Sequence, residues 1–136
     1  MRITNTTEIP NEIIRDVIRF TRPPGIHHFR ITVTKYRRYA WRGRGHAGGI
    51  TVRINQDWKY PMRLHTYQYG QLRGRRYYLG SVIEGLIYVI AHELMHTRQG
   101  QKGAVRGRVW GARGRFSEIE CESYAIKKLR EWRSKT

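Results

Sequence analysis

His92-Glu93-Leu94-Met95-His96 carries more structural information than any other segment of this chain. On a helix, positions four residues apart lie on one face, so the imidazoles of His92 and His96 can reach a single metal ion. Glu93, next to the first histidine, is placed to deprotonate a water molecule that the metal activates. The five residues therefore predict a helix that holds a catalytic type of zinc site.

A strongly apolar run, residues 81–91, precedes this motif. Ser81 and Glu84 have the S-x-x-E spacing of a capping box, which predicts that the helix begins near Val82. Polar groups near the end of a buried helix are costly without a partner. The context therefore favours a metal site over unrelated histidines on a surface helix.

A catalytic zinc site needs a third protein ligand and an open fourth position. No histidine follows His96, and Cys121 is the single cysteine, so carboxylates after the motif are the better candidates. They are Glu118, Glu120, Glu122 and Glu131. Cys121 itself stays a ligand in principle.

The last amphipathic pattern predicts a helix from about Ser117 to Arg133. On it Glu118 and Glu122 point toward the apolar face, whereas Glu120 points to the opposite side. An inward carboxylate can either ligate the metal or accept a hydrogen bond from a ligating histidine. The pattern alone leaves both roles open for Glu118 and for Glu122.

With these residues the sequence resembles the gluzincins, zinc peptidases whose third ligand is a glutamate on a later helix in the pattern E-x-x-[A/S]-D. Glu118-Ile119-Glu120-Cys121-Glu122 is similar to it, with Cys121 at the small position and Glu122 where aspartate is usual. Tyr124-Ala125 looks like the aromatic-alanine step that follows in many small members.

That resemblance implies a role for each residue of the two motifs. His92, His96 and Glu118 would hold a single Zn²⁺ ion per chain, and Glu93 would be the catalytic base. Glu122 would orient a ligating histidine or serve as the alternative ligand.

The rest of the chain predicts one α+β domain over residues 1–136. A helix begins at Pro10 and ends before Pro23. Strands are predicted over residues 26–36, 50–54 and 62–69, with a strand or turn at 75–79 and loops at 37–49 and 99–115. This order of N-terminal helix, about three mostly antiparallel strands, metal helix and ligand helix resembles small zincin domains of the gluzincin and SprT-like kind. In such domains an edge strand pairs with the substrate, and we expect residues 62–69 to form it.

Charge is the second large feature, since 27 Lys and Arg stand against 10 Asp and Glu for a net charge of +17. Such a balance implies a polyanionic partner, and DNA or RNA fits because each neutralised phosphate releases counterions. Arginines of four Arg-Gly-Arg triplets are the predicted contacts: Arg42, Arg44, Arg73, Arg75, Arg106, Arg108, Arg113 and Arg115.

A single cysteine excludes an internal disulfide and fits a reducing compartment. The first residues lack the apolar core of a secretory signal, and Glu84 interrupts the longest apolar stretch, so no membrane span is expected. These observations predict a cytoplasmic or virion protein, and they leave its oligomeric state open.

The function predicted from the sequence is zinc-dependent hydrolysis of peptide bonds in a protein or peptide substrate, in association with nucleic acid. The alternative is a basic nucleic-acid-binding or virion-packing protein with a structural or vestigial zinc site. The two differ in whether Glu93 matters, because a general base is dispensable for binding.

Overall fold

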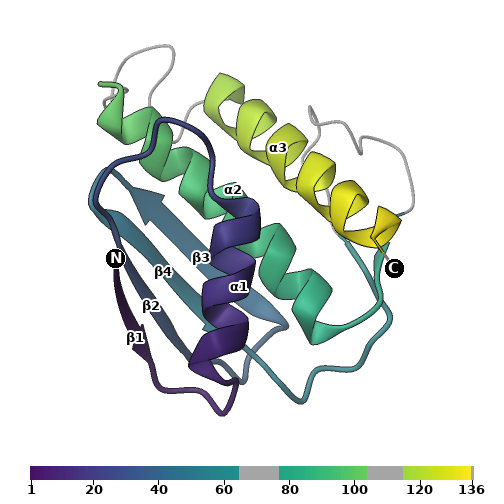
Figure 1. Ribbon diagram of the computed structural model, residues 1–136. Coiled ribbons are helices and arrows are strands. Elements are labelled where there is room, and N and C mark those ends of the chain that lie inside the picture. Colours follow the sequence, from purple (N-terminus) through teal and green to yellow (C-terminus); the bar gives the residue numbers. More distant parts are fainter. Residues whose placement is uncertain (65–76, 104–114, 136) are drawn as a thin grey trace.

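The computed structural model describes residues 1–64, 77–103 and 115–135. Within them the chain has an α+β architecture of three helices and two sheets (Figure 1). In chain order the elements are β1 (Arg2–Asn5), α1 (Asn11–Thr21), β2 (Arg30–Lys35), β3 (Trp41–His46), β4 (Gly49–Ile54), β5 (Met62–Arg63), β6 (Tyr78–Leu79), α2 (Val82–Gln101) and α3 (Arg115–Ser134).

The larger sheet has the strand order β1-β2-β4-β3. β1, β2 and β4 are parallel neighbours, and β3 pairs antiparallel with β4 at the edge. The expectation of about three mostly antiparallel strands is therefore wrong. Parallel strands need a crossover connection, and α1 provides it between β1 and β2.

Strand β3 corrects a second expectation, because residues 37–49 were predicted to be a loop. Trp41-Arg42-Gly43-Arg44-Gly45-His46 lacks the β-branched residues that mark a strand, and glycine usually weakens one. Here the glycines permit close contact with α2. A Cβ at Gly45 would overlap the backbone carbonyl of Glu93.

The expected edge strand over residues 62–69 is also not found as predicted. Met62 and Arg63 form β5, which pairs antiparallel with β6 in a separate two-stranded sheet. Residues 65–69 lie outside the described part of the chain. The strand that lies along α2 at the edge of the larger sheet is β3.

The helices follow the sequence more closely. Helix α1 buries Ile14, Val17 and Ile18, as its apolar periodicity predicts. Helix α2 begins at Val82, and the Ser81 hydroxyl accepts a hydrogen bond from the Glu84 backbone N–H at 3.3 Å. Helix α2 continues to residue 101, so the first residues of the predicted 99–115 loop are helical.

All three helices lie over one face of the larger sheet, with α2 between the sheet and α3 (Figure 1). This central position buries α2 continuously from Gly85 to Thr97. Consequently the polar residues near its C-terminal half are enclosed by β3 on one side and by α3 on the other. No helix in the described ranges has the length and apolar character needed to cross a bilayer.

Candidate metal centre

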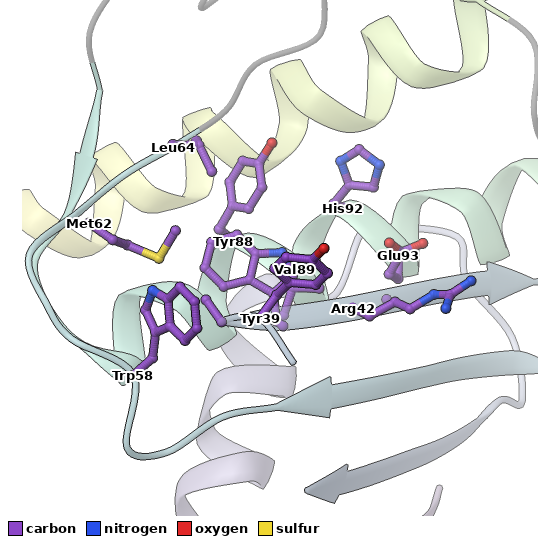
Figure 2. A pocket seen from close by; sticks show the side chains of 12 residues that line it. Tyr39, Arg42, Trp58, Met62, Leu64, Tyr88, Val89, His92 and Glu93 are labelled. Carbon is purple, nitrogen blue, oxygen red and sulfur yellow. The ribbon is translucent and has the colours of Figure 1, made fainter. Parts of the chain in front are cut away.

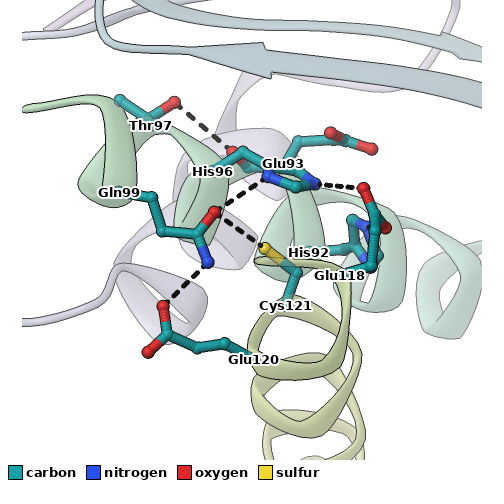
Figure 3. A network of polar contacts seen from close by, with 8 residues as sticks. All are labelled: His92, Glu93, His96, Thr97, Gln99, Glu118, Glu120 and Cys121. Carbon is teal, nitrogen blue, oxygen red and sulfur yellow. Dashed lines mark hydrogen bonds and ion pairs between the residues drawn. The ribbon is translucent and has the colours of Figure 1, made fainter. Parts of the chain in front are cut away.

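The two histidines of α2 meet a single carboxylate from the start of α3 (Figure 3). His92 Nε2 lies 3.1 Å from Glu118 Oε2, and His96 Nε2 lies 3.0 Å from Glu118 Oε1. The exposed fractions of the three residues are 5%, 4% and 8%. The fold therefore brings together, in a buried position, the residues that the sequence proposes as a ligand set.

Electrostatics at this cluster favour a charged carboxylate. Burial alone raises the pKa of Glu118, but hydrogen bonds from His92 and His96 outweigh it and hold that pKa well below its usual range. Burial lowers the pKa of His96, but Glu118 and Glu93 more than compensate, so the net shift of that pKa is upward. The ionised carboxylate consequently favours a positive charge beside it, either on a protonated imidazole or on a bound cation.

Cys121 is a second candidate for the third ligand position. One ligand atom each from His92, His96 and Cys121 lie within 4.8 Å of one another, and all three residues are buried. Burial, with the nearby charges of Glu118 and Glu93, raises the pKa of the Cys121 thiol well above its usual range. A bound metal would itself lower that pKa, because metals bind the thiolate. The geometry therefore leaves two candidates for the third ligand: Glu118, which contacts both histidines, and Cys121.

Glu93 is enclosed between α2 and β3, with 8% of its surface exposed. Gly43 makes room for it, because a Cβ at Gly43 would lie 2.6 Å from Glu93 Oε2. Of the other three candidate carboxylates, Glu131 pairs with Lys128, and Glu122 is fully buried on α3, as its inward helical position predicts. Glu120 is exposed, in agreement with its position on the opposite side of α3.

Gln99 is a functional candidate that the sequence reasoning missed. Its Oε1 accepts a hydrogen bond from His96 Nδ1 at 3.0 Å, and its Nε2 donates to Glu120 Oε1 at 2.8 Å (Figure 3). With Nδ1 as the donor, loss of the Nε2 proton would leave the Nε2 lone pair of His96 directed at the Glu118 side, where a metal would bind. The i, i+3 spacing from His96 is the signal that would have found it.

A pocket of about 450 Å³ opens beside the candidate centre, between β3, β5 and α2 (Figure 2). Arg42, His92 and Glu93 form its polar side. Gly43 and apolar side chains form the rest: Tyr39, Ala40, Trp41, Trp58, Met62, Leu64, Tyr88 and Val89. An apolar pocket with a few convergent polar groups is the usual form of a small-ligand or side-chain binding site.

Of the eight arginines predicted to contact nucleic acid, three lie in the described residues and five do not. Arg42 and Arg44 are exposed on β3. Arg115 begins α3. The other five, Arg73, Arg75, Arg106, Arg108 and Arg113, lie outside the described residues.

No protein-family model, curated protein or solved structure matches this chain. The likeness to gluzincins therefore rests on the two motifs. The chemistry of the site has to be inferred from its own geometry.

Proposed function

We propose that this chain is a zinc-dependent peptidase of the gluzincin type. The observation that carries the proposal is the pair of contacts from the Glu118 carboxylate to His92 Nε2 and His96 Nε2. Glu93 stands next to His92 on the same helix, on the side that faces β3. Two imidazoles, one carboxylate and an adjacent glutamate are the groups that metal-assisted peptide hydrolysis needs.

The donor set fits zinc rather than a hard cation. Imidazole nitrogens and one carboxylate are typical ligands of catalytic zinc, whereas calcium and magnesium prefer oxygen ligands alone. A bound zinc ion would polarise the scissile carbonyl and lower the pKa of a coordinated water to about 7. His92, His96 and Glu118 would hold the ion, and Gln99 would fix the orientation of the His96 ring.

In this proposal the remaining residues bind the substrate and move protons. Glu93 takes a proton from the attacking water and passes it to the leaving amine. Strand β3 ends the described sheet, so an extended peptide can pair with its outer edge and pass beside His92 and Glu93. The aromatic pocket then receives one apolar side chain of that peptide.

The first test is elemental analysis of zinc on protein purified without a histidine tag. We expect about one zinc per chain. In a second assay, the zinc-loaded protein should cleave an unstructured protein such as casein. Glu93→Gln should keep the zinc and lower the cleavage rate at least about 100-fold, because only the general base is lost. A chain that takes up no zinc, even after incubation with the metal, would contradict the proposal.

A second function has support from the charge of +17 and from exposed arginines such as Arg42 and Arg44. It is that of a nucleic-acid-binding or virion-packing protein whose zinc site is structural or vestigial. Under it the wild-type protein binds nucleic acid and zinc but cleaves no peptide, with or without nucleic acid. Glu93→Gln then leaves nucleic-acid binding at the wild-type level.

A further inference from the structure

The face of the four-stranded sheet that points away from the helices is lined with arginine and threonine. In β3 the Cβ positions of the glycines face α2, and side chains alternate along a strand, so Arg42 and Arg44 lie on the opposite face. Arg42, at the edge of the sheet, also lines the aromatic pocket. The register places Arg42 opposite Arg53 and Arg44 opposite Thr51. Arg42, Arg44, Thr51 and Arg53 surround a shallow hollow of about 320 Å³. We call this surface, over β1 to β4, the open face.

The same composition continues across the two parallel strands. Arg2 lies opposite Arg30, and both are exposed. A row of threonines, Thr4, Thr32 and Thr51, crosses the face from β1 to β4. None of these four strands contains an aspartate or a glutamate.

Two of the cross-strand pairs on the open face place like charges directly opposite each other, Arg2 with Arg30 and Arg42 with Arg53. Such pairs destabilise a sheet, whereas an ordinary solvent-facing sheet alternates opposite charges. This arrangement therefore costs folding stability. A polyanion bound across the face would offset that cost by neutralising both pairs.

We propose that the open face binds the phosphate backbone of a nucleic-acid duplex. Arginine and threonine are standard donors to phosphate oxygens. Side chains on one face of a strand repeat about every 6.7 Å, and strands lie about 4.8 Å apart, so the donors form a regular grid. Trp41 is the single aromatic residue of the four strands, and it points toward the helices. Without aromatic platforms for stacking bases, the face suits a duplex better than a single strand.

This inference rests on the nucleic-acid binding proposed as the second function and is independent of the hydrolysis. Strand β3 contributes to both surfaces, with Gly43 beside Glu93 and Arg44 on the open face. A duplex on the open face leaves the aromatic pocket accessible on the helical side. The substrate class that this geometry indicates is a protein held close to duplex nucleic acid.

The test compares two variants that each remove three of the 27 basic residues. One carries Arg30→Gln, Arg44→Gln and Arg53→Gln on the open face. The control carries Arg15→Gln, Lys127→Gln and Arg130→Gln, which are exposed on α1 and α3. Because the total charge is equal in both, a difference reports the location of the contacts.

Binding is measured by fluorescence anisotropy over a range of salt concentrations, with DNA duplex, RNA duplex, the single strand of equal length and vesicles containing phosphatidylserine. We expect the open-face variant to lower the slope of log K against log salt by about 2–3, since each lost phosphate contact contributes about 0.9. At fixed salt its duplex affinity should fall at least tenfold, while the control changes less than about threefold. The two duplexes show whether DNA or RNA is preferred, and both outcomes are consistent with phosphate recognition.

Equal losses in the two variants, or tighter binding to the single strand or to vesicles, would overturn the inference. Zinc content and thermal melting of the open-face variant verify that its fold is intact. A chain that binds duplex through these arginines but takes up no zinc would contradict the peptidase proposal alone.

Discussion

Gly43 is the residue on which the position of Glu93 depends. A Cβ there would lie 2.6 Å from Glu93 Oε2 and 2.7 Å from Val89 Cγ2, closer than real Cβ atoms approach their neighbours. We expect Gly43→Ala to displace the carboxylate and to lower the peptidase rate at least about tenfold, since displacement by 1 Å can cost about 100-fold. Zinc content should stay at the wild-type value, as measured in parallel with the casein assay.

Gly80→Ala is the matched control for this change. The nearest atom to a Cβ at Gly80 is a carboxylate oxygen of Glu84 at 3.7 Å, an ordinary contact. Wild-type activity in both alanine variants would show that Glu93 does not need the space that Gly43 leaves.

Glu118 and Cys121 compete for the role of third ligand, and their removal should have unequal effects. We expect Glu118→Gln to lower zinc affinity more than about 100-fold, beyond the 10–100-fold typical of groups that only support a ligand. Cys121→Ala should change it less than about tenfold, because in the proposed site Glu118, which contacts both histidines, fills the third position. Competition with a chromophoric chelator measures both affinities. The reverse order would assign the ligand role to Cys121.

At the residue scale, spacing along a helix predicted the cluster well. His92 and His96 share a face by their i, i+4 spacing, and the inward position of Glu118 follows from the apolar face of α3. Gln99 was missed because a loop was predicted from residue 99 on, whereas α2 continues to Gln101, and the i, i+3 spacing from His96 has meaning only on a helix. Its role depends on the position of Glu120 across the interface, which only the packing of α3 against α2 determines.

At the scale of elements, an ion pair between Arg133 and Glu84 joins the end of α3 to the start of α2. Its Nη2 lies 2.6 Å from Glu84 Oε1, and Glu84 Oε1 also accepts the Gly80 N–H at 2.9 Å. Burial raises the pKa of Glu84, but the hydrogen bonds from Arg133 and Gly80 outweigh it, so that pKa lies below 4.5. The carboxylate thus contributes stability above pH 4.5 that is lost as the pH falls through its folded-state pKa.

We therefore expect Glu84→Gln to lower the free energy of unfolding by about 1 kcal/mol at neutral pH, a value limited by the partial exposure of both partners. The variant should also lose less stability than the wild type below pH 4.5. Urea unfolding at several pH values measures both effects. Glu131→Gln, which removes a more exposed carboxylate paired with Lys128, is the control and should change stability by less than about 0.5 kcal/mol. If the free energy of unfolding had the same pH dependence in Glu84→Gln and in wild type, the role given to the Arg133–Glu84 ion pair would be contradicted.

The helices and the strands β2 and β4 could be predicted from sequence, whereas β1, β3 and the direction of the strands could not. Helix α2 has a cap at Ser81 and an unbroken apolar run, which are local signals. Strand β3 contains two glycines, which weaken a strand by themselves. Their contribution, the space that lets α2 pack closely, depends on the tertiary structure. Strand β1 spans Arg2–Asn5, too short for periodicity to be recognised, and it is fixed by its register with β2. Strand direction followed from the crossover through α1, which no pattern in the strands themselves encodes.

At the scale of the whole molecule, the four-stranded sheet separates the two proposed sites. The buried residues of α2 reach the metal site and the aromatic pocket on the helical side, whereas the open face lies on the other side of the sheet. Strand β3 belongs to both sides through its alternation of glycine and arginine. The same alternation that brings β3 close to Glu93 therefore presents its arginines to solvent.

The candidate metal centre also joins elements that are distant in sequence, since His92 and His96 come from α2 and Glu118 from α3. A ligand that binds the folded state alone raises the free energy of unfolding by about 2.7 kcal/mol at a concentration 100 times its Kd. For a chain of this size we expect a rise in Tm of roughly 10 °C in differential scanning calorimetry with zinc. His96→Ala should abolish the rise, because it removes one ligand from the centre. An equal rise in that variant would place the stabilising zinc elsewhere, for example at the exposed His27, His28 or His46, and would remove the link between α2 and α3 on which the proposed peptidase site depends.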